Sequence, residues 1–329
     1  MNRFKRSGRV MMAALTALRR EKKLLFFPLI AFGLTLGIVL FFLAPVVFYP
    51  TGNSYLTAAH WQALGNLIGH AVDPARYHAA GPAVVSSHVG GTAPWINHGW
   101  VLAFFAVIYF SSMILATFTN VAFYHEIMQV LNGGNASISR GYRFAAGRWQ
   151  AVLLWSLFAG LVGYIIQAIE RRAGIFGRII GSLIGVAWSV ACIFILPTLV
   201  RETETANPLR MLRSSVQTVQ RTWGELVIGF VGAEMVFGVV FLGLLLGVGL
   251  LTAGIVAAFV HFGAAGWAIG LTIAAALLGL FLSAIALSWA SKMVNAVYRS
   301  ALYIYATEGV VPDAFDQELL DSAWKVKQG

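Results

Sequence analysis

Six apolar stretches, each long enough to cross a bilayer, constrain the fold of this chain more than any other feature. They cover residues 24–49, 100–123, 151–169, 177–199, 226–251 and 267–290. A spanning helix needs about 20 mostly apolar residues, and lipid cannot satisfy free backbone groups, so each stretch must be helical. Charged residues make up only 11% of the chain, against about 25% in soluble domains. We therefore expect an all-α polytopic membrane protein with six transmembrane helices.

Positive charge lies almost entirely on one side of these spans. The N-terminal arm, the second-to-third and fourth-to-fifth connections and the C-terminal tail hold every Lys and Arg except Arg76, Arg171, Arg172 and Arg178. The positive-inside rule places these basic segments, and both termini, in the cytoplasm. We expect a multi-pass protein of the bacterial cytoplasmic (inner) membrane. The net charge of +10 lies beside apolar spans, which favours anionic lipid headgroups over nucleic acid.

A basic, partly amphipathic segment precedes each pair of spans. The three segments cover residues 9–23, 137–149 and 208–223, and the last two end in a tryptophan at the point of membrane entry. We interpret them as three copies of one unit, an amphipathic surface helix followed by a transmembrane hairpin. The alternative is that any cytoplasmic loop of such a protein needs Arg and an interfacial Trp.

The chain divides into three predicted parts. Residues 1–23 form a basic amphipathic arm, residues 24–300 the six-helix membrane domain, and residues 301–329 a cytoplasmic tail. The membrane domain carries an extracytoplasmic insertion at 51–97, in or directly after which lie His60, His70, His78, His88 and His98. Their spacing places no two on one helical turn, unlike a metal-binding helix. A solvated His-rich segment is therefore favoured over a metal site or a proton sensor.

Several short motifs resemble a known family. They are Lys22-Lys23-Leu24-Leu25-Phe26-Phe27-Pro28, Pro197 with Glu202, Arg213-Ser214, Thr222-Trp223-Gly224 and Ala301-Leu302-Tyr303-Ile304-Tyr305-Ala306-Thr307. Over nearly its whole length except 51–97, the chain resembles an uncharacterised family of bacterial six-span integral membrane proteins, a domain of unknown function. Its layout is also similar to the membrane domain attached to some glycerophosphodiester phosphodiesterases. The first resemblance implies fold and location only. The soluble phosphodiesterase domain is absent, so that activity is not inferred.

Glu234 is the sharpest candidate for an intramembrane polar site. At 1.5 Å per residue it is expected roughly 14 Å into the fifth span, where a carboxylate is costly and should face a cavity or a partner. Lys292, near the cytoplasmic end of the sixth span, can approach it if the last two spans pack antiparallel. The functional interpretation is a proton- or ion-coupled site. The alternative is a structural pair, or a Glu234 kept protonated by desolvation.

Four polar residues are expected to converge on the cytoplasmic face. His125 and Glu126 end the second span, Glu202 follows the fourth, and Glu225 opens the fifth. A metal site would need two or three ligands together, but adjacent helical residues point about 100° apart, so His125 and Glu126 do not form a pair by themselves. Glu225 can instead complement the helix dipole. We predict no metal site and no cofactor.

Glycines recur at four-residue intervals in two spans. Gly177, Gly181 and Gly185 share one helical face, and Gly243 and Gly247 share another. Such faces let helices approach closely. We expect close packing within the chain, with homodimerisation as the alternative.

The basic segments supply candidate contacts for lipid headgroups, which are Arg140, Arg143, Arg148, Arg210, Arg213 and Arg221. The predicted partners are membrane lipids, preferably anionic, with a membrane-protein partner or a second copy as alternatives and no nucleic acid. No Ser-His-Asp order, HExxH motif or pair of intramembrane aspartates occurs, so no catalytic residue is identified and an enzyme is not predicted. The expected function is an integral membrane module that binds lipid or a partner protein. The alternative is a transporter or channel that uses Glu234 and Lys292.

Overall fold

The computed structural model describes residues 12, 14–72, 98–172, 174–202, 206–263 and 265–312, and every regular element in these ranges is a helix. The elements are η1 (Lys22–Leu25), α2 (Phe26–Val47), α3 (Ala58–Val72), α5 (His98–Leu131), α6 (Ile138–Gly147), α7 (Trp149–Arg172), α8 (Gly174–Ala191), α9 (Ile195–Arg201), α10 (Pro208–His261) and α11 (Gly266–Glu308). Six stretches of these helices are long and apolar enough to cross a membrane. The predicted fold class, an all-α protein with six transmembrane helices, is therefore confirmed.

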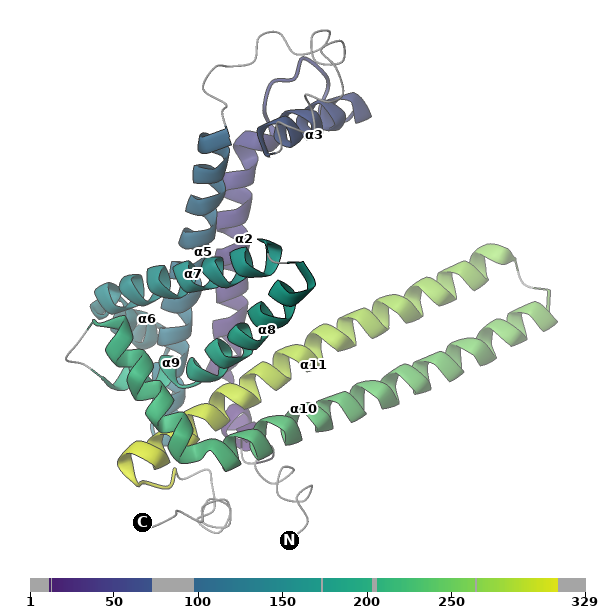
Figure 1. Ribbon diagram of the computed structural model, residues 1–329. Helices are drawn as coiled ribbons and strands as arrows, with labels where there is room; N and C mark the ends of the chain where they lie inside the picture. Colours follow the sequence, from purple (N-terminus) through teal and green to yellow (C-terminus); the bar gives the residue numbers. More distant parts are fainter. Residues whose placement is uncertain are drawn as a thin grey trace.

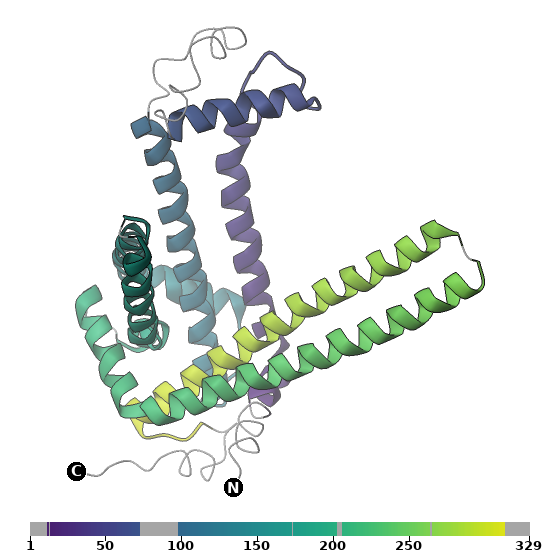
Figure 2. The ribbon, with the colours of Figure 1, turned by 45° about the vertical axis from the view of Figure 1, so that its right-hand side comes forward.

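The spans are arranged as three consecutive helix pairs. α2 packs on α5, α7 packs on α8, and α10 packs on α11. Figure 1 shows α2 and α5 side by side, with α3 lying across their ends. The pair formed by α10 and α11 is a long hairpin that extends away from the other spans in both views (Figures 1 and 2).

The buried core lies where the ends of several spans meet. It draws on the start of α2, the end of α5, the start of α7, the junction of α8 and α9, the first part of α10 and the end of α11. Representative members are Phe27, Ile127, Trp155, Phe194, Met211 and Leu302. We call this the core end of the molecule. Along the rest of the spans, large apolar side chains such as Leu250 and Phe281 are exposed, as expected for a surface that faces lipid.

Three helices extend beyond the predicted spans because their ends pack into this core. α5 continues to Leu131, α11 continues to Glu308, and α10 begins at Pro208 rather than near residue 226. Residues 293–304 of α11 include Asn295, Arg299 and Ser300, so hydropathy ends the span at residue 290. They are nonetheless buried almost without exception, which keeps them helical.

The predicted fourth span is not one helix. α8 ends at Ala191 and α9 begins at Ile195, two residues before Pro197, which has no N–H and would clash with the carbonyl of Ile193 in a continuous helix. The buried hydroxyl of Ser215 fills the break. It accepts a hydrogen bond from the Phe194 N–H at 3.2 Å and donates one to the Ala191 carbonyl at 2.6 Å. The first part of α10 is thereby fixed against the junction of α8 and α9.

Helical segments precede each pair of spans, at the places expected for the three surface helices. Residues 14–20 are helical before η1 and α2, α6 precedes α7, and the first turns of α10 precede its apolar part. The N-terminus of α6 is capped by the side chain of Ser137, and that of α10 by the side chain of Asn207. Such caps satisfy N–H groups that a helix leaves free in its first turn. α10 differs from the expectation in having no break between its surface segment and its span.

The two glycine faces behave differently. A Cβ added to Gly181 would lie 2.3 Å from Cγ of Glu170 on α7, and one added to Gly185 would lie 3.8 Å from Cγ2 of Ile166. This face therefore allows close packing of α8 on α7, as predicted. A Cβ at Gly243 or Gly247 would meet nothing within 4 Å among the described atoms.

Candidate functional site

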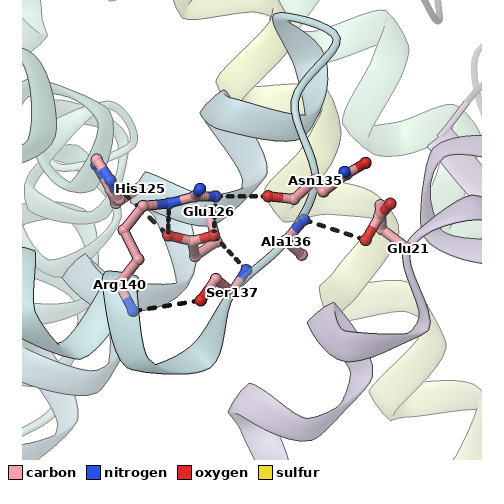
Figure 3. Close-up of polar contacts among 7 residues, drawn as sticks. All are labelled: Glu21, His125, Glu126, Asn135, Ala136, Ser137 and Arg140. Atoms are coloured by element: carbon pink, nitrogen blue, oxygen red, sulfur yellow. Dashed lines mark hydrogen bonds and ion pairs between the residues drawn. The ribbon is translucent and has the colours of Figure 1, made fainter.

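Glu126 is the centre of a polar cluster at the core end. It lies near the end of α5 and its side chain is 0% exposed. Arg140 of α6 contacts both carboxylate oxygens, with Nε donating to Oε1 at 3.0 Å and Nη2 donating to Oε2 at 2.7 Å. The Ser137 N–H donates to Oε2 at 2.6 Å. Figure 3 shows these groups converging on one carboxylate from a single loop and the helix that follows it.

The loop between α5 and α6 is held from two sides. Arg140 also donates to the carbonyl of Asn135, while the Ala136 N–H donates to Oε2 of Glu21 at 3.1 Å. Glu21 lies directly before η1, so the cluster joins the first surface segment to the second (Figure 3). The hydrogen bonds that Arg140 donates to Glu126 raise the pKa of Arg140 above its ordinary value, so the guanidinium stays charged throughout the physiological range.

Gly141 allows α6 to approach α5 closely. A Cβ at this position would lie 2.8 Å from the Ala122 carbonyl oxygen, 3.0 Å from Cγ of Glu126 and 3.1 Å from Cζ of Phe27. Because all three neighbours are part of the buried core, they have little room to move. The absence of a side chain at Gly141 therefore sets the distance at which Arg140 reaches Glu126.

Arg148 anchors the end of α9 to the start of α7. Its Nη1 donates to the carbonyl of Leu199 at 2.7 Å and also to the carbonyl of Glu202. Its guanidinium carbon lies 5.4 Å from the ring centroid of Phe144, close enough for a cation–π interaction. Burial lowers the pKa of Arg148 from its ordinary value. Carbonyls at the end of a helix lack partners within that helix, and Arg148 supplies donors for two of them here.

Glu202 also contacts a surface helix, as Glu126 does, but through a single hydrogen bond. The hydroxyl of Ser214, in the first part of α10, donates to Oε1 of Glu202, which directly follows α9. Ser214 precedes Trp223 by the same number of residues as Arg140 precedes Trp149. The next residue in each copy, Gly141 or Ser215, is the one that makes the close backbone contact with the preceding hairpin. This correspondence supports the interpretation of the surface helices as repeats.

The last hairpin is tied to the second by an ion pair. Arg201, at the end of α9, lies 2.9 Å from Oε1 of Glu308, at the end of α11. Both side chains are partly exposed, and exposed pairs typically contribute about 0–1 kcal/mol. The contact therefore indicates the relative position of the two helix ends more than it adds to stability.

The predicted polar cluster of His125, Glu126, Glu202 and Glu225 is brought together in part. The sequence predicts that His125 and Glu126 do not form a pair by themselves. In the structure Nε2 of His125 lies 3.8 Å from Oε1 of Glu126, beside Arg140, which donates hydrogen bonds to the same carboxylate. The imidazole stacks on Phe144, with 3.9 Å between ring centroids, which turns it toward the carboxylate despite the angle between adjacent helical residues. Among the described residues, no hydrogen bond or ion pair joins Glu202 to either one. The side chain of Glu225 lies outside the described residues.

Glu234 lies within the apolar part of α10. Residues 226–233, which precede it in the predicted fifth span, are all apolar or glycine, and the helix is continuous from Pro208 to His261. Oε1 of Glu234 accepts hydrogen bonds from the Ser291 hydroxyl at 2.7 Å and from Nδ2 of Asn295 at 2.8 Å. None of the ion pairs among the described residues joins Glu234 to Lys292, which is exposed between two buried neighbours of α11.

The candidate headgroup arginines fall into two groups. Arg140 and Arg148 form the internal contacts above. Arg143, Arg210, Arg213 and Arg221 are exposed, and none takes part in an ion pair among the described residues. Exposed Arg19, Arg20, Lys22 and Lys23 form a similar group on the first segment.

The histidines of the 51–97 insertion are only partly described. His60 is buried and bonded to Thr51 and to the carbonyl of Val47. His78 and His88 lie outside the described residues, and the same holds for the side chains of His70 and His98. Within the described residues, no group of three or more His, Cys, Asp or Glu side chains is arranged to hold a metal ion.

The sequence did not predict the contacts that hold the core end together. Glu126 was identified, but not its partner Arg140, and neither Ser214 nor Ser215 was singled out as a contact. A signal was present in Ser137, a good N-cap residue three positions before Arg140. Ser137 marks the start of α6, and its position shows that the first turn of α6, which includes Arg140, comes soon after the end of α5. Nothing in the sequence marks Leu199 as a partner of Arg148, because that contact uses a backbone carbonyl.

The comparisons with known proteins identify one family. A family model described as Family of unknown function (DUF6159) matches residues 98–312. The match includes five of the candidate spans and most of the core-end contacts, but not the Lys22–Pro28 motif. The comparison with curated proteins and the comparison with solved structures give no match. The matched segment is more than half of the chain, and the chain therefore belongs to the Family of unknown function (DUF6159).

Proposed function

We propose that this chain is a non-enzymatic integral membrane module whose core end binds anionic lipid headgroups. The observation that carries the proposal is the division among its arginines. Arg140 and Arg148 hold the core end together, whereas Arg143, Arg210, Arg213 and Arg221 point their charge outward without a carboxylate partner among the described residues.

The exposed cations lie on segments that lead directly into apolar spans. Arg143 is on α6, immediately before α7, and the other three are on the first turns of α10. Each basic residue near an anionic membrane surface contributes about 1 kcal/mol of attraction. Trp149 and Trp223, both exposed, follow these arginines at the points of membrane entry, and Trp favours the headgroup layer. Charge and aromatic side chains therefore both suit a lipid surface.

The same distribution supports an orientation. The basic segments all contribute to the core end, so the positive-inside rule assigns the core end to the cytoplasmic side. We propose a multi-pass protein of the bacterial inner membrane with both termini cytoplasmic. Bacterial origin and the likeness to the membrane domains of glycerophosphodiester phosphodiesterases stay predictions.

Thermal unfolding in a neutral detergent tests the proposal. A ligand that binds only the folded protein raises its Tm with concentration. We expect phosphatidylglycerol to raise the Tm of the purified protein more than phosphatidylcholine of the same acyl chains, and the difference to shrink at high salt. Equal shifts with the two lipids would contradict the proposal. A protein that copurifies and is displaced by neutralising the exposed arginines would favour a protein partner instead.

A second candidate function, a transporter or channel, is supported by the contacts of Glu234. This carboxylate, within the apolar part of α10, accepts hydrogen bonds from two buried polar groups of the neighbouring helix, Ser291 and Asn295. Polar groups so placed often mark ion or substrate paths. Flux measurements in liposomes separate the two candidates. Flux that is lost in Glu234→Gln while the protein stays folded would favour transport, and no flux above that of empty liposomes would leave lipid binding.

A further inference from the structure

We propose that α3 lies in the lipid headgroup layer on the side of the membrane opposite the core end, as a neutral interfacial helix. α3 follows the first span and lies within the His-rich 51–97 insertion. The contacts that hold it, its exposed side chains and its lack of charge together identify a lipid surface as its partner.

The side chain of His60 fixes α3 to the end of α2. Its Nε2 lies 3.0 Å from the carbonyl oxygen of Val47, the last residue of α2, and its Nδ1 lies 2.7 Å from Oγ1 of Thr51. A carbonyl can only accept, so Nε2 is the donor in its contact with Val47. The ring is 0% exposed. His60 thus supplies a donor to a carbonyl that the end of α2 leaves without one.

This attachment determines the direction of α3. Leu64, one turn after His60, is also buried, so both residues lie on the face that packs toward the spans, and α3 contacts α5 as well. In Figure 2 the helix lies crosswise over the ends of α2 and α5. A helix that lies across the ends of two spans runs along the membrane surface rather than into it.

Exposed aromatic and apolar side chains continue from the end of the span onto α3. Leu56 is 97% exposed and Trp61 is 51% exposed. Ring contacts join Phe48 to Tyr55, Tyr55 to His60, and His60 to Trp61, with centroids 5.7, 4.9 and 5.4 Å apart. Tyr and Trp concentrate at membrane–water interfaces because their rings are apolar and their tips are polar. The chain of rings begins one residue after α2 ends.

α3 carries no charged side chain, which suits an interaction with the headgroup layer that does not depend on lipid charge. No Asp, Glu, Lys or Arg occurs between Leu24 and Val72, so α3 has no group that would recognise a lipid by its charge. It differs in this respect from the basic segments at the core end. We therefore expect α3 to bind neutral and anionic bilayers equally, through apolar burial and its aromatic side chains.

Site-directed spin labelling of the full chain in nanodiscs tests this placement. Cys192, the only cysteine, is first replaced by Ser, and Leu56→Cys, Trp61→Cys and Gln62→Cys are labelled one at a time. Gln62 is exposed and adjacent to Trp61, which makes it a matched control on the same helix. We expect the labels at positions 56 and 61 to collide more with oxygen, which partitions into lipid, and less with a polar nickel complex than the label at 62.

Three results would overturn the proposal. Equal access of the nickel complex to all three labels would place α3 in water. Low access of both reagents at positions 56 and 61 would show that protein covers this face. Lipid-like access found only in anionic nanodiscs, and not in phosphatidylcholine, would contradict a neutral interaction. If the Trp61 variant unfolds, the label at position 56, two residues before α3 begins, decides, because replacing a side chain that is 97% exposed should leave the fold intact.

Discussion

Glu126 and Arg140 are joined by a two-point ion pair, with 3.0 Å between Nε and Oε1 and 2.7 Å between Nη2 and Oε2. The pair connects the end of one hairpin to the surface helix that begins the next. A planar guanidinium and a carboxylate match in this geometry, which fixes orientation as well as distance. The first two hairpins are therefore linked by a directional contact at the core end and not only by apolar packing.

Arg140→Ala is expected to destabilise the protein by about 3 kcal/mol, because the buried negative charge of Glu126 would lose the positive charge that balances it. Glu126 would keep the hydrogen bond from the Ser137 N–H and the more distant His125 ring, at 3.8 Å. The matched control is Arg143→Ala, on the same helix but exposed and without an ion pair among the described residues, for which we expect a change within about 0.5 kcal/mol. Unfolding in detergent measures both. Equal losses of stability in the two variants would refute a structural role for the pair.

Gly141→Ala is expected to destabilise the protein by about 1–3 kcal/mol, since the added methyl group overpacks a buried site. Its carbon would lie 2.8 Å from the Ala122 carbonyl oxygen. Gly147, at the other end of α6, has nothing within 4 Å of an added Cβ, so Gly147→Ala should be neutral or slightly stabilising through helix propensity. The Tm of each variant decides. A Gly141→Ala protein as stable as the control would mean that α6 packs less closely than described.

Arg148→Lys is expected to loosen α9 selectively. A lysine carries the same charge but lacks the planar group that reaches two carbonyls and stacks on a ring. A hydrogen bond from a charged group is worth about 1.5–3 kcal/mol, so amides of α9 should exchange hydrogen roughly tenfold faster if their opening is local. Arg221→Lys, at an exposed position on α10, should leave this exchange unchanged. Uniform acceleration over all helices would indicate global destabilisation instead.

Glu234→Gln and Glu234→Ala are expected to differ in stability. The amide oxygen of Gln can accept the hydrogen bonds that Ser291 and Asn295 now donate to the carboxylate. In the Ala variant both buried donors lose their acceptor, at a cost of about 1–3 kcal/mol each. Unfolding in detergent should rank wild type and Gln together above Ala. A Gln variant as unstable as Ala would show that the negative charge itself is required.

The sequence predicts the number and type of spans because lipid imposes both length and helicity. It places their ends less well, since hydropathy reports the lipid-facing part of a helix and not the part that continues into a protein core. The end of α11 is an example, because Asn295 and Ser300 lower hydropathy but are buried. The break before Pro197 is predictable in principle from the missing N–H, but the Ser215 hydroxyl that fills it comes from another element.

The candidate site is predictable only in part because its contacts join distant segments. The sequence predicts that Lys292 can approach Glu234 if the last two spans pack antiparallel, whereas the hydrogen bonds of Glu234 in the structure come from Ser291 and Asn295. Ser291 and Asn295 are one turn apart and share a face, while Lys292 is turned away from it by about 100°. Charge alone does not identify the partners of Glu234, because the angular position on α11 decides which side chains reach it. For the same reason, the sequence did not show that Arg140 binds Glu126.

Native mass spectrometry of the protein released from mixed-lipid nanodiscs tests the central claim most directly. In one variant Arg143, Arg210, Arg213 and Arg221 are each replaced by Gln, and in a matched control each is replaced by Lys. The account predicts that the wild type and the Lys variant retain phosphatidylglycerol in preference to phosphatidylcholine and that the Gln variant loses this preference while staying folded. An unchanged preference in a folded Gln variant would contradict the assignment of these arginines to lipid headgroups.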